Sequence, residues 1–398
     1  MKIMIISDLD VERGRGPITR LACVLPELGR RAEVVLAALG PADATCAAAI
    51  GRSAVTVHPV DFALDGWDVA GLDTVVSRLL AVVTRERPDV VVLYREIWDL
   101  AYALEPALAG RGIPFLLMPH SIPFLDSMAR PTRSFVLDFV RRLATERRGY
   151  AARYMLAHAH QAPLLRRLPT VLINETLRDY LDGYFPRAPR VLALPGYALD
   201  LPSIDTVRGG PKRYDVAFMA KLTAGKGVFD LLAVMRRLRA ARPGARMVVI
   251  GSFDDEPTRR RFLAARERLG LTDAVELAGW LSDADKYRVL DSARVFCYPS
   301  NSNDTFSLCL LEALACGLPA VCYDMPYVRA VYGRTSAVRA VRLRDTAAMA
   351  AGLDRLLDDP DTPGAAGREF AEGYASWSAV AEAEIGAYAR FLRPAEVR

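Results

Sequence analysis

The stretch DVAFMAKLTAGKGVFDLLAVMRRLRAARPGARMVVI (residues 215–250) decides the fold class. It opens with an unbroken apolar run, passes through a glycine-containing turn into an amphipathic helix expected at 228–240, and ends in a second apolar run at 246–250. Apolar strands separated by amphipathic helices are typical of parallel sheets that helices cover on both faces. The stretch therefore predicts a doubly wound α/β architecture.

The same alternation runs along the rest of the chain. Further strands are expected at 2–7, 32–38, 89–94, 112–118, 274–278, 295–298 and 320–323, and further helices at 18–29, 75–86, 259–269 and 308–316. A turn-rich passage at 195–211 divides this pattern and has the composition of a linker. We expect two Rossmann-like domains, 1–195 and 196–370, that face a cleft, because ligands of such folds bind outside the carboxyl ends of the strands.

Composition excludes several classes of protein. The 398 residues are 52% apolar and 25% charged, as in folded soluble proteins, and their longest apolar runs fall far short of the roughly 18 residues that cross a bilayer. Asp8 and Asp10 interrupt the apolar start before a signal-peptide core could form. The six cysteines include no CxxC pair, which argues against a zinc site and disulfides. We expect a cytoplasmic protein.

The net charge of +5 is concentrated in one segment. Between residues 121 and 168 there are nine arginines and three acidic residues. A helix expected at 134–156 places Val136, Phe139, Val140 and Leu143 on one face. A solvated helix face is the favoured interpretation; attraction to anionic lipid or to a phosphorylated acceptor is the alternative. We expect at most weak peripheral contact with the inner face of a membrane.

The most informative segment for chemistry is PSNSNDTFSLCLLEALACGLP (residues 299–319). Asp304 lies in its loop, and Glu312 follows about two turns into the helix that begins near Leu308. Free N–H groups at a helix start form an anion site, and carboxylates accept hydrogen bonds from the paired hydroxyls of a ribose or a hexose. The alternative is that Asp304 only caps the helix while Glu312 is solvated or pairs with an arginine.

A second cluster favours the ligand-binding interpretation. Lys221 and Lys226 follow the strand at 215–219 in a turn with two glycines, a combination that suits phosphate, although lysines in loops are often only solvated. Both clusters are expected at the mouth of one sheet. Together they predict a nucleotide diphosphate held by the two lysines and by the N–H groups near Ser307.

These motifs resemble those of the retaining GT-B glycosyltransferases of family 4, also called glycosyl transferases group 1. The matching segments are AKL at 220–222, GKG at 225–227, PS at 299–300 and EALACGLP at 312–319. Weaker similarities are spread over nearly the whole chain, at Gly14, Gly16, 87–89, His120 and 374–377. The resemblance implies a GT-B fold whose last segment, 371–398, forms a helix that crosses back to the N-terminal domain.

The resemblance implies a hexosyltransferase that uses a UDP- or GDP-linked sugar and keeps the anomeric configuration, with no metal and no cofactor. Lys221 and Lys226 would bind the diphosphate, Asp304 the sugar hydroxyls and Glu312 the ribose. Backbone contacts would come from Phe306, Ser307 and Leu308, and the loop ending at Gly16 would approach phosphate and acceptor. The catalytic residues implied are His120, Lys226 and Asp304, with His120 over the donor sugar.

The chain departs from the family pattern at two of these positions. Asp304 stands where glutamate is usual, which shortens the side chain by one methylene, and Ser307 replaces a glycine. His120 could equally be a core or capping histidine. Tyr94 and Arg95 leave a strand end and are candidates for contact with the acceptor, with a structural ion pair to Glu96 as the alternative.

Two other classes of function remain open. A GT-B nucleotide-sugar epimerase would share the fold and the nucleotide site, but such enzymes typically open with a GTRPE loop, whereas the first strand here leads into DLDVERGRG at 8–16. A non-catalytic sugar-nucleotide binder is the third possibility. Nucleic acid is not an expected partner, because the basic segment lacks interleaved stacking aromatics. The expected partners are a nucleotide-sugar donor and an acceptor that is a glycan, a lipid-linked molecule or a small molecule.

Overall fold

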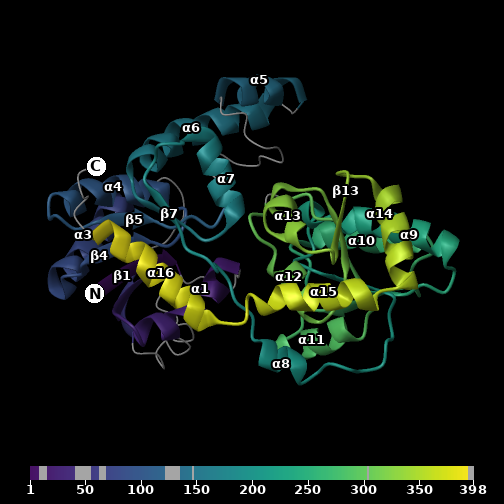
Figure 1. Cartoon of the computed structure of the whole chain (residues 1–398). Helices are drawn as coiled ribbons and strands as arrows, with labels where there is room; N and C mark the ends of the chain where they lie inside the picture. Colours follow the sequence, from purple (N-terminus) through teal and green to yellow (C-terminus); the bar gives the residue numbers. More distant parts are fainter. Residues whose placement is uncertain are drawn as a thin grey trace. The chain divides into compact units, whose positions relative to one another are not determined.

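The computed structural model describes residues 1–8, 16–40, 55–61, 69–121, 135–145, 148–302 and 304–392 (Figure 1). Gly14 and three of the nine arginines of the basic segment lie outside these ranges. The chain divides into two compact units, one formed by Met1–Ala198 with Ser376–Arg398 and the other by Leu199–Ala375. We call them the N-terminal and the C-terminal unit. Their boundaries fall within a few residues of the expected ones.

The N-terminal unit contains a parallel sheet, which in the described residues has seven strands in the order β3-β2-β1-β4-β5-β6-β7. Strand order reverses between β1 and β4, the arrangement of a doubly wound sheet whose ligands bind at the carboxyl edge near the reversal. The central strands are fully buried apolar runs, as expected for a sheet covered on both faces. The strands are β1 Lys2–Asp8, β2 Glu33–Leu39, β3 Val55–Val60, β4 Val90–Leu93, β5 Phe115–Leu117, β6 Thr170–Leu172 and β7 Arg190–Leu192.

The helices of this unit include one from the far end of the chain. The last helix packs along the first one (Figure 1), so the N-terminal unit is built from both ends of the sequence. The helix expected at 134–156 is instead two helices, which corrects the prediction. The bounds are α1 Gly16–Gly29, α3 Val69–Glu86, α4 Trp98–Ala109, α5 Phe135–Thr145, α6 Arg148–Arg167, α7 Glu175–Tyr184 and α16 Trp377–Leu392.

The C-terminal unit has a second parallel sheet, whose order in the described residues is β10-β9-β8-β11-β12-β13. Its strands are β8 Val216–Met219, β9 Met247–Ile250, β10 Val275–Gly279, β11 Val295–Tyr298, β12 Ala320–Tyr323 and β13 Val338–Val341. Its helices are α8 Leu201–Asp205, η1 Ala224–Lys226, α9 Val228–Ala241, α10 Glu256–Arg268, α11 Asp283–Asp291, α12 Leu308–Ala315, α13 Pro326–Ala330, η2 Tyr332–Arg334, α14 Thr346–Asp358 and α15 Asp361–Glu372. The sheet reverses between β8 and β11, which brings the two motif-bearing loops to one edge.

Part of the turn-rich passage at 195–211 belongs to the core of the C-terminal unit, so the passage is not only a linker. Asp200 caps α8 by accepting a hydrogen bond from the N–H of Ser203, and Leu201 and Ile204 are buried in the core of the C-terminal unit. The two ends of this unit are joined, since the Leu199 N–H donates to the Tyr374 carbonyl at 2.7 Å. In the part of the chain that the structure describes, no helix is both long and apolar enough to cross a bilayer.

Candidate functional site

The two predicted clusters of the C-terminal unit meet at an ion pair. The Lys226 ammonium lies 2.6 Å from both carboxylate oxygens of Asp304, in the loop between β11 and α12. Hydroxyls of Tyr298, Ser300 and Ser302 lie 3.2–3.4 Å from the same carboxylate. Both charged side chains are about one-fifth exposed, so the pair remains accessible to a ligand.

The turn that carries Lys226 is pressed against the loop that carries Asp304. Gly227 has φ +77°, and a Cβ at this position would lie 2.0 Å from the Pro299 carbonyl oxygen. The Gly225 carbonyl accepts the Asn301 N–H at 2.9 Å, and Thr223 caps the turn. Glycine is therefore required at 227 for both its backbone conformation and its size. This close contact fixes the distance between the lysine and the aspartate.

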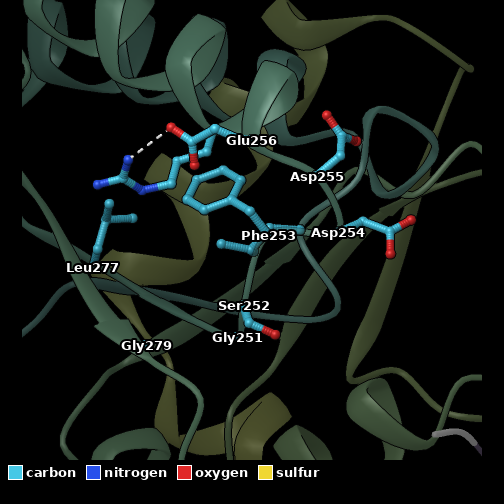
Figure 2. Close-up of a pocket in the computed structure, with 10 residues that line it drawn as sticks. Gly251, Ser252, Phe253, Asp254, Asp255, Glu256, Leu277 and Gly279 are labelled. Carbon is cyan, nitrogen blue, oxygen red and sulfur yellow. Dashed lines mark hydrogen bonds and ion pairs between the residues drawn. The ribbon is translucent and has the colours of Figure 1, made fainter. Parts of the chain in front are cut away.

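Lys221 takes a different direction from Lys226. Its ammonium pairs with the Asp254 carboxylate, which follows β9. Asp254 lines a pocket of about 420 Å³ at the carboxyl ends of β8, β9 and β10, together with the Phe253 ring (Figure 2). Gly251 lets two strand ends approach there, since a Cβ would lie 1.9 Å from the Ala220 carbonyl oxygen. The pocket extends the site sideways from the lysine turn along the edge of the sheet.

The start of α12 is held by Ser307 rather than by Asp304. The Ser307 hydroxyl accepts the Leu310 N–H, and its carbonyl accepts a hydrogen bond of 2.6 Å from Tyr332. The alternative that Asp304 caps this helix is therefore wrong. Phe306 packs against the rings of Tyr332 and Tyr374, with centroids 5.8 Å away in both cases. Together with Leu308, the first residue of α12, these residues form a rigid entrance to the helix.

Glu312 lies inside α12 and is 9% exposed. Its carboxylate oxygen Oε1 is 2.7 Å from the Lys286 ammonium and accepts a 3.1 Å hydrogen bond from Tyr287. Neither alternative for Glu312, solvation or pairing with an arginine, is correct. Lys286 and Tyr287 come from α11, an element that the sequence pattern did not predict, and they orient the carboxylate.

In the N-terminal unit, His120 lies beyond the end of β5 and is 6% exposed. Its backbone N–H and that of Ser121 both donate to one oxygen of Glu96, the latter at 2.7 Å. Its ring packs against Tyr94, with ring centroids 4.5 Å apart. His120 is thus fixed through both its backbone and its side chain.

The proposed acceptor residues differ in exposure. Tyr94 is fully buried, and its hydroxyl accepts a hydrogen bond from Arg20, whereas the Arg95 side chain is 27% exposed with its Nε 3.8 Å from Glu96. A direct contact with a ligand is therefore open to Arg95 and not to Tyr94 in this conformation. Gly16 is the first residue of α1, at the carboxyl edge of the same sheet.

The protein environment determines the protonation of the candidate catalytic lysine and histidine. Burial opposes the ammonium form of Lys226, but Tyr298 and Asp304 outweigh it and raise the pKa of this lysine. Burial, then the charges of Arg20 and Arg95, hold the pKa of His120 well below its usual value. Lys226 is therefore charged and His120 neutral at neutral pH.

Metal binding has no visible support in the described part of the chain. No group of three or more His, Cys, Asp or Glu side chains there is arranged to hold a metal ion. Metal-independence stays a prediction.

A family profile matches most of the C-terminal unit, which carries the lysine turn. Residues 207–371 match the profile of the family described as glycosyl transferases group 1. This segment, less than half of the chain, is therefore similar to that family. The matched range contains Lys221, Lys226, Asp304 and Glu312, the residues on which the resemblance was based.

Curated relatives of the chain include two mannosyltransferases. The phosphatidyl-myo-inositol mannosyltransferase of Mycolicibacterium smegmatis is 32% identical over 135 residues, which cover 34% of this chain and 33% of the relative. The MMP alpha-(1->4)-mannosyltransferase of Mycolicibacterium hassiacum is 29% identical over 238 residues, 59% of this chain and 56% of the relative. The chain therefore spans about a third of the length of the first of these relatives and just over half of the second.

Solved structures match the chain along almost its whole length. Sucrose-phosphate synthase from Thermosynechococcus elongatus has a TM-score of 0.74 at 16% identity and covers 98% of both chains. At this identity the likeness shows the fold alone, and that fold is GT-B. The expectation of a GT-B fold is confirmed, and the profile match at residues 207–371 supports the expectation of a group 1 glycosyltransferase.

Proposed function

We propose that the protein transfers a hexosyl residue from a UDP- or GDP-linked sugar to an acceptor hydroxyl and retains the anomeric configuration. The observation that carries this proposal is the contact between Lys226 and Asp304 at the entrance to α12. This edge of the sheet offers a cation and helix N–H groups for the diphosphate. It also offers a carboxylate for the sugar hydroxyls. Glu312, oriented by Lys286, supplies the acceptor of hydrogen bonds for the ribose.

In the proposed reaction, the bond between the anomeric carbon and the diphosphate oxygen breaks, and the electron pair remains on the diphosphate. Lys226 and the N–H groups of α12 stabilise this charge because they are already in place before the reaction. The acceptor oxygen then bonds to the anomeric carbon on the same face. Its proton passes to an oxygen of the leaving diphosphate, so no further base is needed.

His120 has the properties of a neutral hydrogen-bonding group in this proposal. Its depressed pKa keeps the imidazole uncharged, and an uncharged imidazole can contact a sugar hydroxyl without adding positive charge beside a developing oxocarbenium ion. Arg95, partly exposed beside it, is the proposed contact for the acceptor. Gly16 is proposed to let the backbone approach the donor phosphate closely.

The names of the relatives guide the choice of donor and acceptor. Both are mannosyltransferases, which favours mannose as the transferred sugar, and the name of the first includes a phosphatidyl-inositol lipid. We therefore rank mannose donors first, and we rank phosphatidylinositol and other lipid-linked acceptors ahead of free sugars. No metal ion or cofactor takes part in the proposed reaction.

Weak peripheral contact with a membrane belongs to the same proposal. Four apolar side chains of α5 are 46–64% exposed: Val136, Leu137, Val140 and Leu143. Apolar side chains beside arginines suit an anionic interface. We expect partial sedimentation with phosphatidylglycerol vesicles at low salt that is largely lost at physiological salt. Strong sedimentation at physiological salt, or none at low salt, would contradict this part.

One assay separates the three classes of function. The protein is incubated with GDP-mannose, UDP-glucose and UDP-N-acetylglucosamine, with and without an acceptor pool, and the products are followed by NMR. Acceptor-dependent release of nucleoside diphosphate with an α-linked product from an α-linked donor supports the proposal. An inverted product contradicts retention. A changed sugar on an intact nucleotide indicates an epimerase, and binding without turnover of any donor indicates a binder.

A further inference from the structure

Arg20 is a fully buried charge whose contacts reach separate parts of the N-terminal unit. It lies on α1, and its guanidinium donates to the Tyr94 hydroxyl, the Gly196 carbonyl and the Glu384 carboxylate. Both Arg20 and Glu384 have no exposed side-chain surface. The three acceptors come from the end of β4, from the segment that leaves the unit and from the returning helix α16.

A buried ion pair is a poor source of stability, because removing two charges from water costs as much as their attraction returns. Apolar side chains could fill the same space between α1 and α16. The planar guanidinium donates hydrogen bonds in fixed directions, so it holds its three acceptors in one geometry. The arrangement is therefore better explained by positioning than by stability.

The Arg20 network leads directly to His120. Tyr94, held through its hydroxyl, packs its ring on the His120 imidazole at 4.5 Å between centroids. On the other side, Tyr388 donates to Glu384 at 2.7 Å and contacts the sulfur of Met118, two residues before His120, at 3.9 Å. The histidine segment is thus supported from both ends of one buried network.

We propose that Arg20 is a positioning residue of the transfer site, which fixes the His120 imidazole through Tyr94 and anchors both segments that connect the units to the same point. This inference rests on the proposed function in one respect, the role of His120 in transfer. It adds that Tyr94 supports His120 and does not contact the acceptor.

The effect of the Arg20 charge on the pKa of His120 can be measured without an activity assay. Arg20 and Arg95 are the charged groups that, after burial, lower the pKa of His120, while Glu96 contacts its backbone N–H. Removal of the Arg20 charge is expected to raise the pKa of His120. NMR titration of the imidazole measures this directly.

The first test replaces both charges, in the variant Arg20→Met with Glu384→Met. Replacement of a buried ion pair by apolar residues of similar size often leaves stability unchanged. We expect a melting temperature close to wild type, a kcat lower by between about tenfold and a hundredfold, and a raised pKa of His120. A variant with wild-type stability, kcat and His120 titration would overturn the proposal.

The second test uses Tyr94→Phe, which keeps the ring and removes only the hydroxyl that Arg20 holds. Tyr154→Phe is the matched control, because Tyr154 is equally buried in the same unit and its hydroxyl bonds Tyr184 at 2.6 Å. We expect a lower kcat with an unchanged donor KM for Tyr94→Phe only. This test decides the matter if the double Met variant does not fold.

A double-mutant cycle separates positioning from general damage. If Tyr94 acts through His120, Tyr94→Phe will not lower kcat further in a His120→Gln background. Independent, additive losses would overturn the proposal while leaving the transferase activity in place. If the proposed function itself is wrong, the wild-type protein will turn over no donor. The NMR titration of His120 still tests the effect of Arg20 in that case.

Discussion

The Lys226 ammonium lies 2.6 Å from both carboxylate oxygens of Asp304, so two residues that are 78 positions apart in the chain form one polar group. The sequence motifs assign them separate ligands, the diphosphate and the sugar. In the structure each holds the other in place. The aspartate, shorter than the usual glutamate by one methylene, is therefore bound close to the lysine turn, and a substitution of either residue changes the position of its partner.

Lys226→Ala is expected to lower kcat/KM for the donor by about a hundredfold or more, because a fixed cation at the leaving diphosphate is lost. The melting temperature is expected to change little, since three hydroxyls remain around Asp304. Lys212→Ala is the control, a lysine of the same unit that contacts Asp291. Full activity of Lys226→Ala would show that the diphosphate lies elsewhere.

Glu312→Gln is expected to weaken binding of the nucleoside diphosphate by about tenfold or more, because a charge-assisted hydrogen bond to the ribose is lost. Binding of the 2′,3′-dideoxy analogue is expected to be the same in wild type and variant. Calorimetry with both nucleotides measures the difference, with Glu369→Gln, an exposed position of α15, as the control. An equal loss for both nucleotides would exclude the ribose as the partner of Glu312.

Gly227→Ala is expected to lower the free energy of unfolding by about 1–3 kcal/mol, since φ +77° disfavours a side chain and the new Cβ would lie 2.0 Å from the Pro299 oxygen. The donor KM is expected to rise as well, because the turn carrying Lys226 must move. Gly244→Ala is the matched control, with open space around its Cβ. Denaturant unfolding and donor kinetics are measured together, and a neutral Gly227→Ala would argue against this close packing.

His120 is expected to make the fold sensitive to acid. Its pKa is depressed by burial first and then by Arg20 and Arg95, so the unfolded chain binds a proton at this residue more readily. Its contribution to stability is present above the ordinary histidine pKa of about 6.5 and is lost as pH falls toward the folded value, with a slope of up to about 1.4 kcal/mol per pH unit. Unfolding curves between about pH 7.5 and 5 for wild type and His120→Gln measure this slope, and parallel pH profiles would contradict it.

The meeting of the lysine turn with the loop before α12 could be predicted because each is a contiguous segment that follows a strand. In the lysine turn at 221–227, and in the loop and helix at 299–319, the polar residues lie close together in the sequence. Their chemistry can therefore be inferred from each segment alone. Parallel sheet topology then places their strand ends at one edge. That both clusters lie at one edge followed from topology, whereas the ion pair between Lys226 and Asp304 did not.

The supporting residues could not be predicted because they come from distant elements. Lys286 and Tyr287 lie on α11, whose short, charge-rich sequence has no clear apolar period, and nothing local relates them to Glu312. Arg20 is indistinguishable from a solvated surface arginine until α16 supplies Glu384. The split between α5 and α6 was also missed, since both segments continue the same helical composition.

The return of α16 to the N-terminal unit limits how these proteins can be recombined. Glu384 follows Arg20 by 364 positions, and a chain truncated after Ala375 would keep the arginine in the core without its carboxylate. A C-terminal unit grafted from a relative must therefore be inserted between residues 198 and 376, with the final helix left native. A chimaera of two such proteins is a nested insertion, and not two halves joined end to end.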